Sequence, residues 1–243
     1  MSERTYLVTG ATSGIGRALA ESFKDEGGRL IALGRSLKRL DALKAELEGR
    51  VEVVPVAADL EKPAELNDAL AGVLEMPIDG FVHCAGVSCL VDVRKFKLAE
   101  LERMMAVNFY SFAEILRLIA RKKEKGRRLR VVGISSVASI RGDSKNAIYA
   151  ATKGALDSFV MSAAQDLATQ GVEINTVQPV MVDTRMIDDL KTGYGDSFDD
   201  FVKSRQPLGM LSPDDVVEQI RFLLFKKGTR ISGTSIYMNS GRC

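Results

Sequence analysis

Residues 5–16 read TYLVTGATSGIG, in which a short apolar run is followed directly by three glycines. The apolar run is typical of a buried strand, and the residues after it carry apolar side chains at helical spacing. Gly10, Gly14 and Gly16 allow a tight turn and bring the backbone close to a phosphate at the helix N-terminus, where free N–H groups and the helix dipole favour anions. The stretch therefore predicts a strand, a dinucleotide-binding turn and a helix. It is not a Walker A loop, because no Lys–Ser/Thr pair follows, and it departs from a strict G-x-G-x-x-G, because residue 19 is leucine.

The rest of the chain alternates short apolar runs with longer amphipathic stretches, a rhythm that predicts strand–helix units and a parallel sheet. Most runs are continuously apolar, as expected when helices cover both faces of the sheet. The predicted strands are Thr5–Thr9, Leu30–Leu33, Val51–Val56, Gly80–His83, Arg130–Ile134, Glu173–Gln178 and Ser235–Met238. The predicted helices are Ile15–Asp25, Leu37–Leu47, Pro63–Leu74, Leu98–Val107, Phe109–Lys123, Ala147–Thr169 and Pro213–Phe225. Since no linker or repeat divides the chain, we predict a doubly wound α/β (Rossmann) fold: one domain over residues 1–243, with a seven-stranded parallel sheet flanked by helices.

The composition narrows the classes of function. The 243 residues are 46% apolar and 27% charged, as in globular proteins, and the net charge is +2. A charge this close to neutral argues against a nucleic-acid or anionic-membrane binder, so we expect a small-molecule partner. The single histidine, His83, excludes an H-E-x-x-H zinc site, and the lack of a G-x-S-x-G elbow argues against a Ser-His-Asp hydrolase.

The cysteines and the N-terminus bear on the compartment. Cys84, Cys89 and Cys243 are few and odd in number, and the start MSERT has no apolar signal-peptide core, so we expect a reducing, cytoplasmic compartment. No apolar run approaches the ~20 residues of a spanning helix, so we expect no membrane segment. His83, Cys84 and Cys89 are close in sequence but lack a fourth ligand and a known metal spacing. We therefore predict no metal site and interpret Cys84 as a small core residue.

The end of the second predicted strand bears on the choice of cofactor, because Gly34, Arg35 and Ser36 follow one another there. A NAD site places an Asp or Glu at this point to accept hydrogen bonds from the adenosine ribose. The arginine fork instead suits a 2′-phosphate, with the Ser36 hydroxyl as a second donor, so the sequence favours NADP(H). The alternative, in which Arg35 is only a solvated residue at a helix start, stays open.

Tyr149 and Lys153 are spaced i, i+4 on a predicted helix, which places both side chains on one face. A nearby ammonium favours the phenolate and lowers the pKa of a phenol from ~10, so we expect Tyr149 to exchange a proton near neutral pH. Ser136, thirteen residues earlier at the end of a predicted strand, is placed to hydrogen-bond a carbonyl oxygen. The spacing alone also fits a helix-surface pair, and its weight comes from the combination with Ser136.

Together these motifs resemble the short-chain dehydrogenase/reductase family in its compact form. The matching residues follow the family's order and spacing over nearly the whole chain: Thr9-Gly10-x-x-x-Gly14-x-Gly16, Asp59, Cys84-Ala85-Gly86, Asn108, Ser136, Tyr149-x-x-x-Lys153, and Pro179 with Thr184. The resemblance implies an NADP(H)-dependent oxidoreductase that moves a hydride between the nicotinamide and a carbonyl or secondary alcohol. It also implies a 3-oxoacyl thioester or other ketone as substrate, an acyl carrier protein as a possible partner, and a homotetramer or homodimer packed through the predicted helices Phe109–Lys123 and Ala147–Thr169.

The resemblance further implies a role for each matching residue. Tyr149 is the general acid or base, Ser136 holds the carbonyl oxygen, Lys153 binds the nicotinamide ribose and biases the titration of Tyr149, and Asn108 helps to hold a water that links Lys153 to solvent. Asp59 and Leu60 meet the adenine, and the run from Pro179 to Thr184 lines the nicotinamide. The full set of implied cofactor contacts is Gly10, Thr12, Ser13, Gly14, Ile15, Gly16, Arg35, Ser36, Asp59, Leu60, Cys84, Ala85, Gly86, Tyr149, Lys153, Pro179, Val182 and Thr184.

The chain departs from the family pattern at three places. His83-Cys84 replaces two asparagines, so two amide side chains that brace the sheet are lost, with an expected shift in stability or cofactor affinity. Val180 replaces the glycine that usually follows Pro179 and is expected to narrow the nicotinamide pocket. The tail MNSG, residues 238–241, replaces a more usual Asp-Gly-Gly, which puts the usual C-terminal contacts in doubt. None of these changes removes a catalytic group.

Two further segments invite a functional interpretation. Residues 188–206 form a polar insertion after a strand, which suits a substrate lid and equally suits a disordered surface excursion. Residues 121–130 carry seven cations and one anion, a patch that suits an acidic carrier protein or a phosphorylated substrate. We favour a solvated helix C-terminus for this patch, where cations suit the dipole. Without interleaved aromatic residues it does not indicate a nucleic-acid site.

Two rival functions use the same scaffold. The first is a catalytically idle dinucleotide-binding redox sensor that binds protein partners, against which the intact Ser136, Tyr149 and Lys153 argue. The second is an epimerase or dehydratase that works through a transient hydride step, against which the compact length argues.

Overall fold

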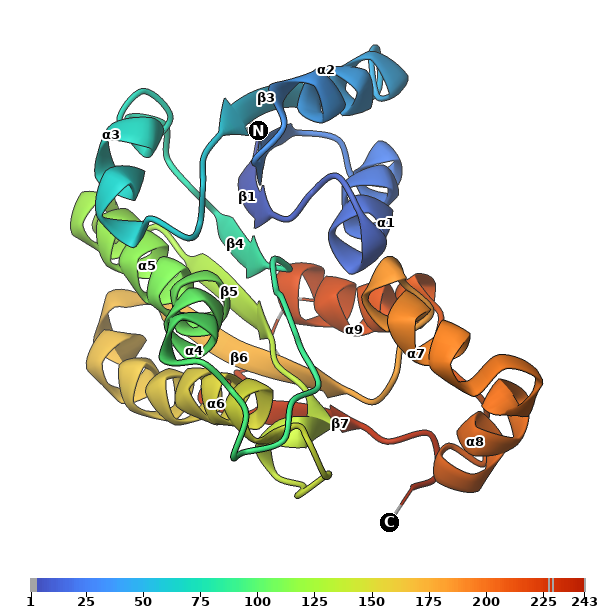
Figure 1. Cartoon of the computed structure of the whole chain (residues 1–243). Helices are drawn as coiled ribbons and strands as arrows, with labels where there is room; N and C mark the ends of the chain where they lie inside the picture. The colour runs from blue at the N-terminus through green and yellow to red at the C-terminus, as the bar shows by residue number, and fades with distance from the viewer. Residues whose placement is uncertain (1–3, 227, 229, 243) are drawn as a thin grey trace.

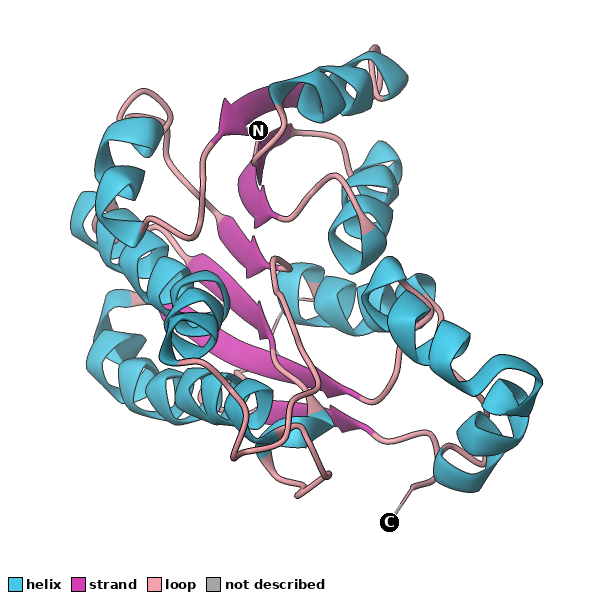
Figure 2. Ribbon diagram, in the orientation of Figure 1, coloured by secondary structure: helices cyan, strands magenta, loops and turns pink. Residues whose placement is uncertain are grey.

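The computed structural model describes residues 4–226, 228 and 230–242; residues 1–3 and Cys243, which entered the predictions, lie outside this part. Seven parallel strands form one sheet in the order β3-β2-β1-β4-β5-β6-β7. The strands are β1 (Thr5–Thr9), β2 (Arg29–Gly34), β3 (Glu52–Ala57), β4 (Gly80–His83), β5 (Leu129–Ile134), β6 (Val172–Pro179) and β7 (Ser235–Met238). The helices are α1 (Gly14–Ser22), α2 (Leu37–Glu46), α3 (Leu66–Leu70), α4 (Leu98–Met105), α5 (Ser111–Lys122), α6 (Ala147–Leu167), α7 (Asp188–Tyr194), α8 (Phe198–Arg205) and α9 (Pro213–Phe225). The predicted doubly wound α/β fold with a seven-stranded parallel sheet is confirmed (Figures 1 and 2).

Helices cover both faces of the sheet, and the alternation of side chains along each strand feeds both layers. On one face Leu7 and Phe81 pack in a buried cluster with α3, α5 and α6. On the other face Tyr6 and Val8 pack with α1, α2 and α9. Figure 1 shows the two layers on opposite sides of the strands. Since both faces are apolar and covered, a ligand can reach the sheet only at the ends of its strands.

Most predicted bounds agree with the structure to within one residue, but the predicted helix Pro63–Leu74 is wrong in length. The chain forms a single 3-10 turn at Pro63–Glu65 and then the short α3, which ends at Leu70. The N–H of Val73 donates to the carbonyl oxygen of Leu70 at 3.0 Å, a tightened turn that ends the helix beside Gly72. Glycine is a poor helix former, which accounts for the early end.

The predicted helices Leu98–Val107 and Phe109–Lys123 are one continuous helical rod. α4 passes into a π-helical segment, Ala106–Tyr110, and then directly into α5. Asn108 lies in the middle of this wide segment. Such π-helical insertions are rare and are frequent at functional sites, so the segment marks this part of the chain for attention.

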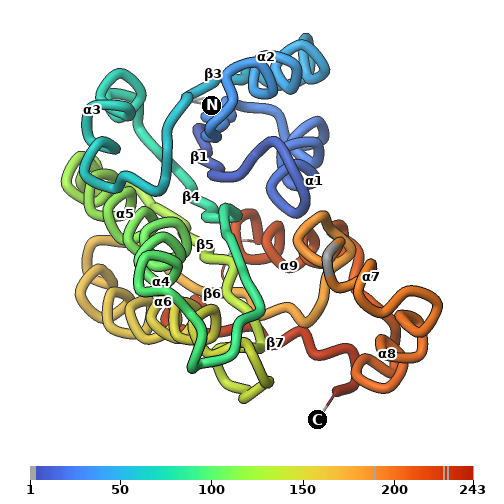
Figure 3. Tube along the Cα trace, in the orientation of Figure 1, coloured from blue at the N-terminus to red at the C-terminus, as the bar shows by residue number. Residues whose placement is uncertain are grey.

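Residues 188–205 form two helices and a 3-10 turn, which contradicts the alternative of a disordered excursion; the substrate lid stays a prediction. α7 and α8 are joined by a 3-10 turn at Gly195–Ser197, and α8 lies apart from the main helical layers, near the C-terminal tail (Figure 3). The Tyr194 and Phe201 rings stack with centroids 4.1 Å apart and hold α7 against α8. Of the helices that the structure describes, none combines the length and apolar character needed to cross a membrane.

Candidate active site

The predicted site residues gather at the carboxyl edge of the sheet, where the strand order reverses between β1 and β4. Thr9 and His83 are register partners at the ends of these two strands. Open α/β sheets bind their ligands in the crevice at such a reversal. The site is therefore described outward from this point.

The glycine turn after β1 packs directly on the loop after β4. Gly10 has a φ of +67°, and a Cβ there would lie 2.9 Å from the Ala85 nitrogen. A Cβ at Gly16 would overlap the carbonyl oxygen of Gly10 and lie 3.1 Å from the Cβ of Cys84. Ser13, the N-cap residue of α1, makes no side-chain capping bond within the described structure, so the first N–H groups of α1 suit an added anion. The turn therefore fits a dinucleotide pyrophosphate. The backbone can form this close-packed cradle only because its glycines carry no side chains.

Arg35 follows β2 directly, and its side chain is 67% exposed. Its Nη1 lies 3.6 Å from Oε1 of Glu61, the same oxygen that Nε of Arg103 contacts at 2.8 Å. Because this carboxylate makes its shorter contact with Arg103, Arg35 keeps most of its capacity for an added phosphate. This placement suits the predicted 2′-phosphate role, while the exposure also suits the solvated alternative.

A second arginine, which the sequence reasoning missed, lies beside the glycine turn. Nη2 of Arg39 donates to the carbonyl oxygen of Thr12 at 3.0 Å. The N–H of Arg39 donates to the Ser36 hydroxyl at 3.4 Å, so Ser36 is the N-cap of α2. The sequence feature that could have identified Arg39 is a cation in the first turn of the helix that follows β2.

The loop after β3 borders the predicted adenine side. Oδ1 of Asp59 accepts from the N–H of Glu61 at 3.1 Å, and Leu60 is buried. The N–H of Ala58 donates to the carbonyl oxygen of Gly34 at 3.0 Å, which joins this loop to the end of β2. Asp59, Leu60 and Arg35 thus belong to one continuous rim.

Lys153 and Asn108 both lie next to the loop after β4. A Cβ at Gly86 would lie 3.6 Å from Nζ of Lys153 and 3.5 Å from Oδ1 of Asn108. Lys153 is buried, and its Nζ donates to the carbonyl oxygen of Ile134 at 2.8 Å. Burial lowers the pKa of Lys153 to about 8, and the Asp157 carboxylate opposes this lowering. The protonation of this lysine is therefore finely balanced near neutral pH.

Tyr149 lies in the first turn of α6, with Nζ of Lys153 5.7 Å from the centre of its ring. Burial raises the pKa of Tyr149 to about 12, and the Ser136 hydroxyl opposes part of this rise. The predicted lowering of the phenol pKa is wrong for this geometry, because the Lys153 ammonium bonds the Ile134 carbonyl and the loss of hydration dominates. A phenol with this pKa is protonated at neutral pH and is ready to donate.

Ser136 follows β5 and begins the 3-10 turn Val137–Ser139. Its Oγ accepts from the N–H of Ala138 at 3.2 Å, which fixes the oxygen while the hydroxyl hydrogen can still be donated. The structure thus brings together Ser136, Tyr149 and Lys153 as the sequence spacing predicts.

Asn108 is fully buried and braces the loop after β4 against α6. Its Oδ1 accepts from the N–H of Val87 at 2.8 Å, and its Nδ2 donates to the Val87 carbonyl oxygen and to Oγ1 of Thr152, each at 2.9 Å. The structure therefore gives the amide side chain a bracing role toward Val87 and Thr152.

His83 braces the sheet, so the expected loss of bracing at this departure is only partial. Its Nε2 lies 3.1 Å from the carbonyl oxygen of Val107 and its Nδ1 2.9 Å from Oγ1 of Thr9. A carbonyl can only accept, so we assign the ring hydrogen to Nε2. Burial, reinforced by the Lys153 charge, lowers the pKa of His83 to about 3, so the ring is neutral. Its neighbour Cys84 is a packed thiol whose pKa burial raises to about 12.

Asp157 is a buried carboxylate that the sequence reasoning missed. Its oxygens accept from Oγ of Ser135 at 2.9 Å, Oγ1 of Thr176 at 2.8 Å and Nε2 of Gln178 at 2.8 Å. Ser135 directly follows β5, and Thr176 and Gln178 belong to β6. The available signal was spacing, because Tyr149, Lys153 and Asp157 follow one another at four-residue steps on one helix face.

The segment after β6 closes the predicted nicotinamide side. A Cβ at Gly14 would lie 3.2 Å from Cγ2 of Thr184, which places Thr184 against the glycine turn. Val182 is buried and bridges to Leu211, and Pro179 is the register partner of Met238 in β7.

Val180 and the tail after β7 also make contacts despite their departure from the family pattern. Val180 is buried, and its N–H donates to the Met238 carbonyl oxygen at 3.0 Å. Leu208 N–H donates to the Ser240 carbonyl oxygen at 3.0 Å.

The remaining candidates lie elsewhere. The basic run 121–130 leads into β5 at the amino edge of the sheet, opposite the site, and three of its cations pair with Glu75, Asp79 and Glu173. Two of these paired cations, Arg127 and Arg130, are largely buried, so part of the run has structural partners and is not simply solvated. No group of three or more metal-ligating side chains is assembled within the described residues.

Comparison with known sequences agrees with this geometry. A sequence model of the family described as short chain dehydrogenase matches residues 4–195. The chain is 32% identical over 241 residues to D-erythrulose reductase of Gallus gallus, with 98% of this chain and 95% of that protein covered. It is 30% identical to L-xylulose reductase of Bos taurus, with 99% and 97% covered. It is also 30% identical to the 3-oxoacyl-[acyl-carrier-protein] reductase FabG of Aquifex aeolicus, with 98% and 96% covered.

Solved structures resemble the whole chain. A 3-oxoacyl-[acyl-carrier protein] reductase of Brucella melitensis superposes with a TM-score of 0.89 at 25% identity and covers 99% of this chain and 91% of its own. A short-chain dehydrogenase/reductase family oxidoreductase of Burkholderia thailandensis gives 0.89 at 28% identity, with 99% and 93% covered. A 3-oxoacyl (acyl-carrier-protein) reductase of Agrobacterium tumefaciens, solved with NADP bound, gives 0.85 at 26% identity, with 98% and 93% covered.

Proposed function

Because the chain belongs to the short-chain dehydrogenase/reductase family of oxidoreductases, we propose that it is an NADP(H)-dependent reductase of ketones with Tyr149 as general acid. One observation carries the proposal. Ala85 packs on Gly10 of the glycine turn, and the next residue, Gly86, faces Lys153, because a Cβ there would lie 3.6 Å from Nζ; the dinucleotide cradle therefore adjoins the Ser136–Tyr149–Lys153 group. Intact catalytic residues beside an intact cradle argue against an idle sensor.

The residues divide the chemistry between them. Ser136 donates a hydrogen bond to the substrate carbonyl oxygen, and Tyr149, protonated at neutral pH, gives that oxygen a proton. The bound cofactor supplies the hydride. Lys153 binds the nicotinamide ribose and, as a cation 5.7 Å from the centre of the Tyr149 ring, favours the phenolate that proton donation leaves behind, an effect that burial outweighs in setting the Tyr149 pKa. Because the phenol pKa is raised, Tyr149 keeps its proton at neutral pH, which is the form that carbonyl reduction requires.

The cofactor assignment rests on the residues around the cradle. Gly10, Gly14 and Gly16 hold the pyrophosphate, and Arg35 with Arg39 holds the 2′-phosphate of NADP(H). The remaining contacts are proposed for Thr12, Ser13, Ile15, Ser36, Asp59, Leu60, Cys84, Pro179, Val182 and Thr184. A neighbour that was solved with NADP bound supports this choice of dinucleotide.

We propose a small-molecule ketone as substrate, with residues 188–206 as its lid. Relatives named as reductases of erythrulose and xylulose support a small ketone, and the FabG relative supports a 3-oxoacyl thioester. The basic run 121–130 lies at the edge opposite Tyr149, which argues against delivery of a carrier-bound thioester through that run.

We also propose a single domain and a homodimer or homotetramer packed through the predicted helices Phe109–Lys123 and Ala147–Thr169. Tyr110 and Met161, on these segments, are large apolar side chains that are about half exposed in the single chain. Light scattering after size-exclusion chromatography tests this assembly, and a monomer would reject it.

The experiment that tests the function follows the absorbance of reduced nicotinamide, with NADPH and NADH in parallel, over ketoses, diketones and 3-oxoacyl thioesters. Oxidation of NADPH in preference to NADH by one ketone class is the expected result. Tight NADPH binding without turnover of any ketone would instead favour the idle sensor.

A further inference from the structure

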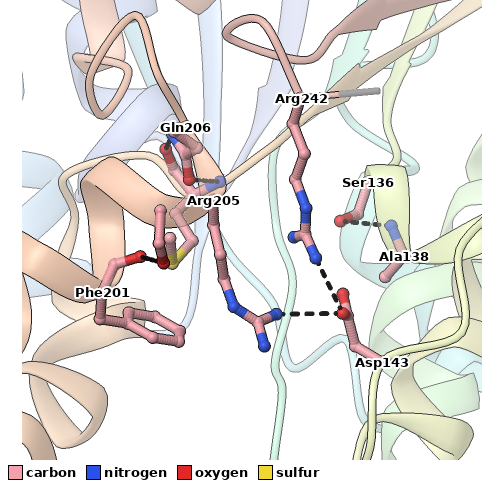
Figure 4. A network of polar contacts seen from close by, with 9 residues as sticks. Ser136, Ala138, Asp143, Phe201, Arg205, Gln206 and Arg242 are labelled. Carbon is pink, nitrogen blue, oxygen red and sulfur yellow. Dashed lines mark hydrogen bonds and ion pairs between the residues drawn. The ribbon is translucent and has the colours of Figure 1, made fainter.

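The substrate side of the carboxyl edge holds a charged cluster that the proposed chemistry does not use. Oδ1 of Asp143 accepts from Nη1 of Arg205 at 3.1 Å and from Nη2 of Arg242 at 3.2 Å (Figure 4). One carboxylate oxygen thus holds two guanidinium groups. The cluster has one more positive charge than negative.

Three separate segments supply this cluster. Asp143 lies in the loop between Ser136 and Tyr149, Arg205 ends α8, and Arg242 lies in the tail after β7. Figure 4 shows both arginines reaching Asp143 from the side of α8 and the tail, with Ser136 in the same view. The loop that carries Asp143 therefore begins and ends at catalytic residues, which places the cluster at the substrate end of the site.

Neighbouring contacts hold both guanidinium groups in place. Gln206, next to Arg205, is buried and bonds both backbone groups of Met181, at 3.1 and 3.2 Å. The Arg205 guanidinium also lies 4.9 Å from the centre of the Phe201 ring. The Leu208–Ser240 backbone bond fixes the tail that carries Arg242. Side chains held in this way lose little freedom when they bind a ligand.

The loop that carries Asp143 also carries a third arginine. Nη1 of Arg141, two residues before Asp143, is buried without a hydrogen-bond partner among the described residues. A buried donor that lacks a partner is costly, so this nitrogen remains available to a hydrogen-bond acceptor.

We propose that Arg205 and Arg242 bind an anionic group of the substrate, a carboxylate or a phosphate, and that this group displaces Asp143. The inference rests on the proposed function, because it assigns the substrate class of the same site. Planar guanidinium forks bind either group bidentately, and the excess positive charge favours a ligand that is more strongly anionic than one shared carboxylate. The preferred substrate is then a ketone that carries an acid function, rather than a neutral ketone.

The same contacts would also suit a latch that only fixes α8 and the tail. The two roles predict different effects of a substitution at Asp143 on the affinity for an anion. If Asp143 competes with the substrate anion, then Asp143→Asn frees both arginines and tightens anion binding. If the cluster is only a latch, then the same substitution loosens the arginines and does not tighten anion binding.

The first experiment uses matched pairs of ketones with NADPH. A hexulosonate is compared with the neutral hexulose, and a ketose phosphate with the free ketose, so that carboxylate and phosphate are distinguished. We expect kcat/KM to be higher for one anionic member, and Arg205→Gln and Arg242→Gln each to lower the anionic-to-neutral ratio about tenfold or more. Arg205→Lys should retain part of the ratio. Arg128→Gln, an exposed arginine next to β5 at the opposite edge, is the matched control and should leave the ratio unchanged.

The second experiment measures binding without turnover. Dissociation constants of a hexonate, a hexitol phosphate and the neutral hexitol are measured by calorimetry on the wild-type protein and on Asp143→Asn. A dissociation constant that is severalfold lower in Asp143→Asn for one anion, and unchanged for the hexitol, supports displacement of Asp143 by the substrate anion. Unchanged or weaker anion binding, together with an anionic-to-neutral ratio that neither arginine variant alters, overturns the inference. If no ketone is reduced at all, the proposed function fails, and the binding experiment decides the anion site by itself.

Discussion

The two halves of the carboxyl edge are built in different ways. In the cofactor half, backbone meets backbone: Gly10 lies against Ala85, and Gly16 lies against Gly10, with no space for a side chain. In the substrate half, α8 and the tail reach the Asp143 loop through the tips of long side chains, Arg205 and Arg242. Backbone contacts fix one shape for one kind of ligand, whereas side-chain tips can change without moving the backbone. The fold therefore specifies the dinucleotide and leaves the choice of substrate to a few side chains.

The largest effect should come from the residue that serves both halves. Tyr149→Phe removes the donated proton and little volume, so we expect turnover to fall by roughly 10²–10⁴-fold while NADPH affinity holds. Steady-state kinetics and NADPH fluorescence titration measure the two quantities. Tyr237→Phe, at an exposed tyrosine of β7, is the matched control. A Tyr149→Phe enzyme with wild-type turnover would end the general-acid mechanism.

The next largest effect should come from a substitution that disrupts the packing of the cofactor half alone. Gly16→Ala places a Cβ onto the Gly10 carbonyl oxygen, and we expect a loss of about 1–3 kcal/mol in unfolding free energy together with weaker NADPH binding. Chemical denaturation and calorimetry measure these changes. Gly72→Ala, whose Cβ would meet no described heavy atom within 4 Å, should preserve NADPH affinity. Equal losses in both variants would mean that the close packing at Gly16 is not what shapes the cradle.

A substitution at Arg35 tests whether a side chain in the cofactor half selects NADPH over NADH. Arg35→Asp removes a phosphate partner and adds repulsion, so we expect the preference for NADPH over NADH to fall by about tenfold or more. The ratio of kcat/KM for the two cofactors measures this preference. Lys38→Asp, an exposed cation of α2 with the same charge change, should alter it much less. Equal shifts would show that only the general positive field matters.

The smallest effect concerns the pKa of Lys153, which lies where the cofactor half and the substrate half meet. The Asp157 carboxylate favours the charged form of Lys153, whose pKa lies at about 8, so Asp157→Asn should lower that pKa further. If the cation stabilises the phenolate, the rate of reduction falls as pH rises through the lysine pKa, and this fall should begin at lower pH in the variant. A pH profile of kcat/KM measures it, with Asp166→Asn at an exposed position of α6 as control. Identical profiles for Asp157→Asn and the wild type would remove Asp157 from a positioning role.

Residues that act through local spacing could be predicted from the sequence. The glycine turn, Tyr149 with Lys153, and the strand ends follow from short-range patterns, and the structure has them as predicted. What could not be predicted depends on long-range contacts. The donors of Asp157 come from the residue after β5 and from β6, and the bracing by His83 depends on Thr9 and Val107, which are distant in sequence. The direction of the Tyr149 pKa shift was missed for the same reason, because spacing cannot reveal that the Ile134 carbonyl takes the Lys153 ammonium.

The π-helical segment Ala106–Tyr110 has a consequence for changes in chain length. A π turn holds one residue more than an α turn over nearly the same rotation, so deleting one residue here would leave a regular α-helix in which α4 and α5 keep their phase. The apolar face of α5, with Ile115, would stay on the sheet, but Asn108 would lose its position against Val87 and Thr152. We expect such a deletion to weaken NADPH binding more than it lowers the free energy of unfolding, whereas a one-residue deletion within α5 itself should lower both. NADPH titration and chemical denaturation of the two deletion variants would show this difference.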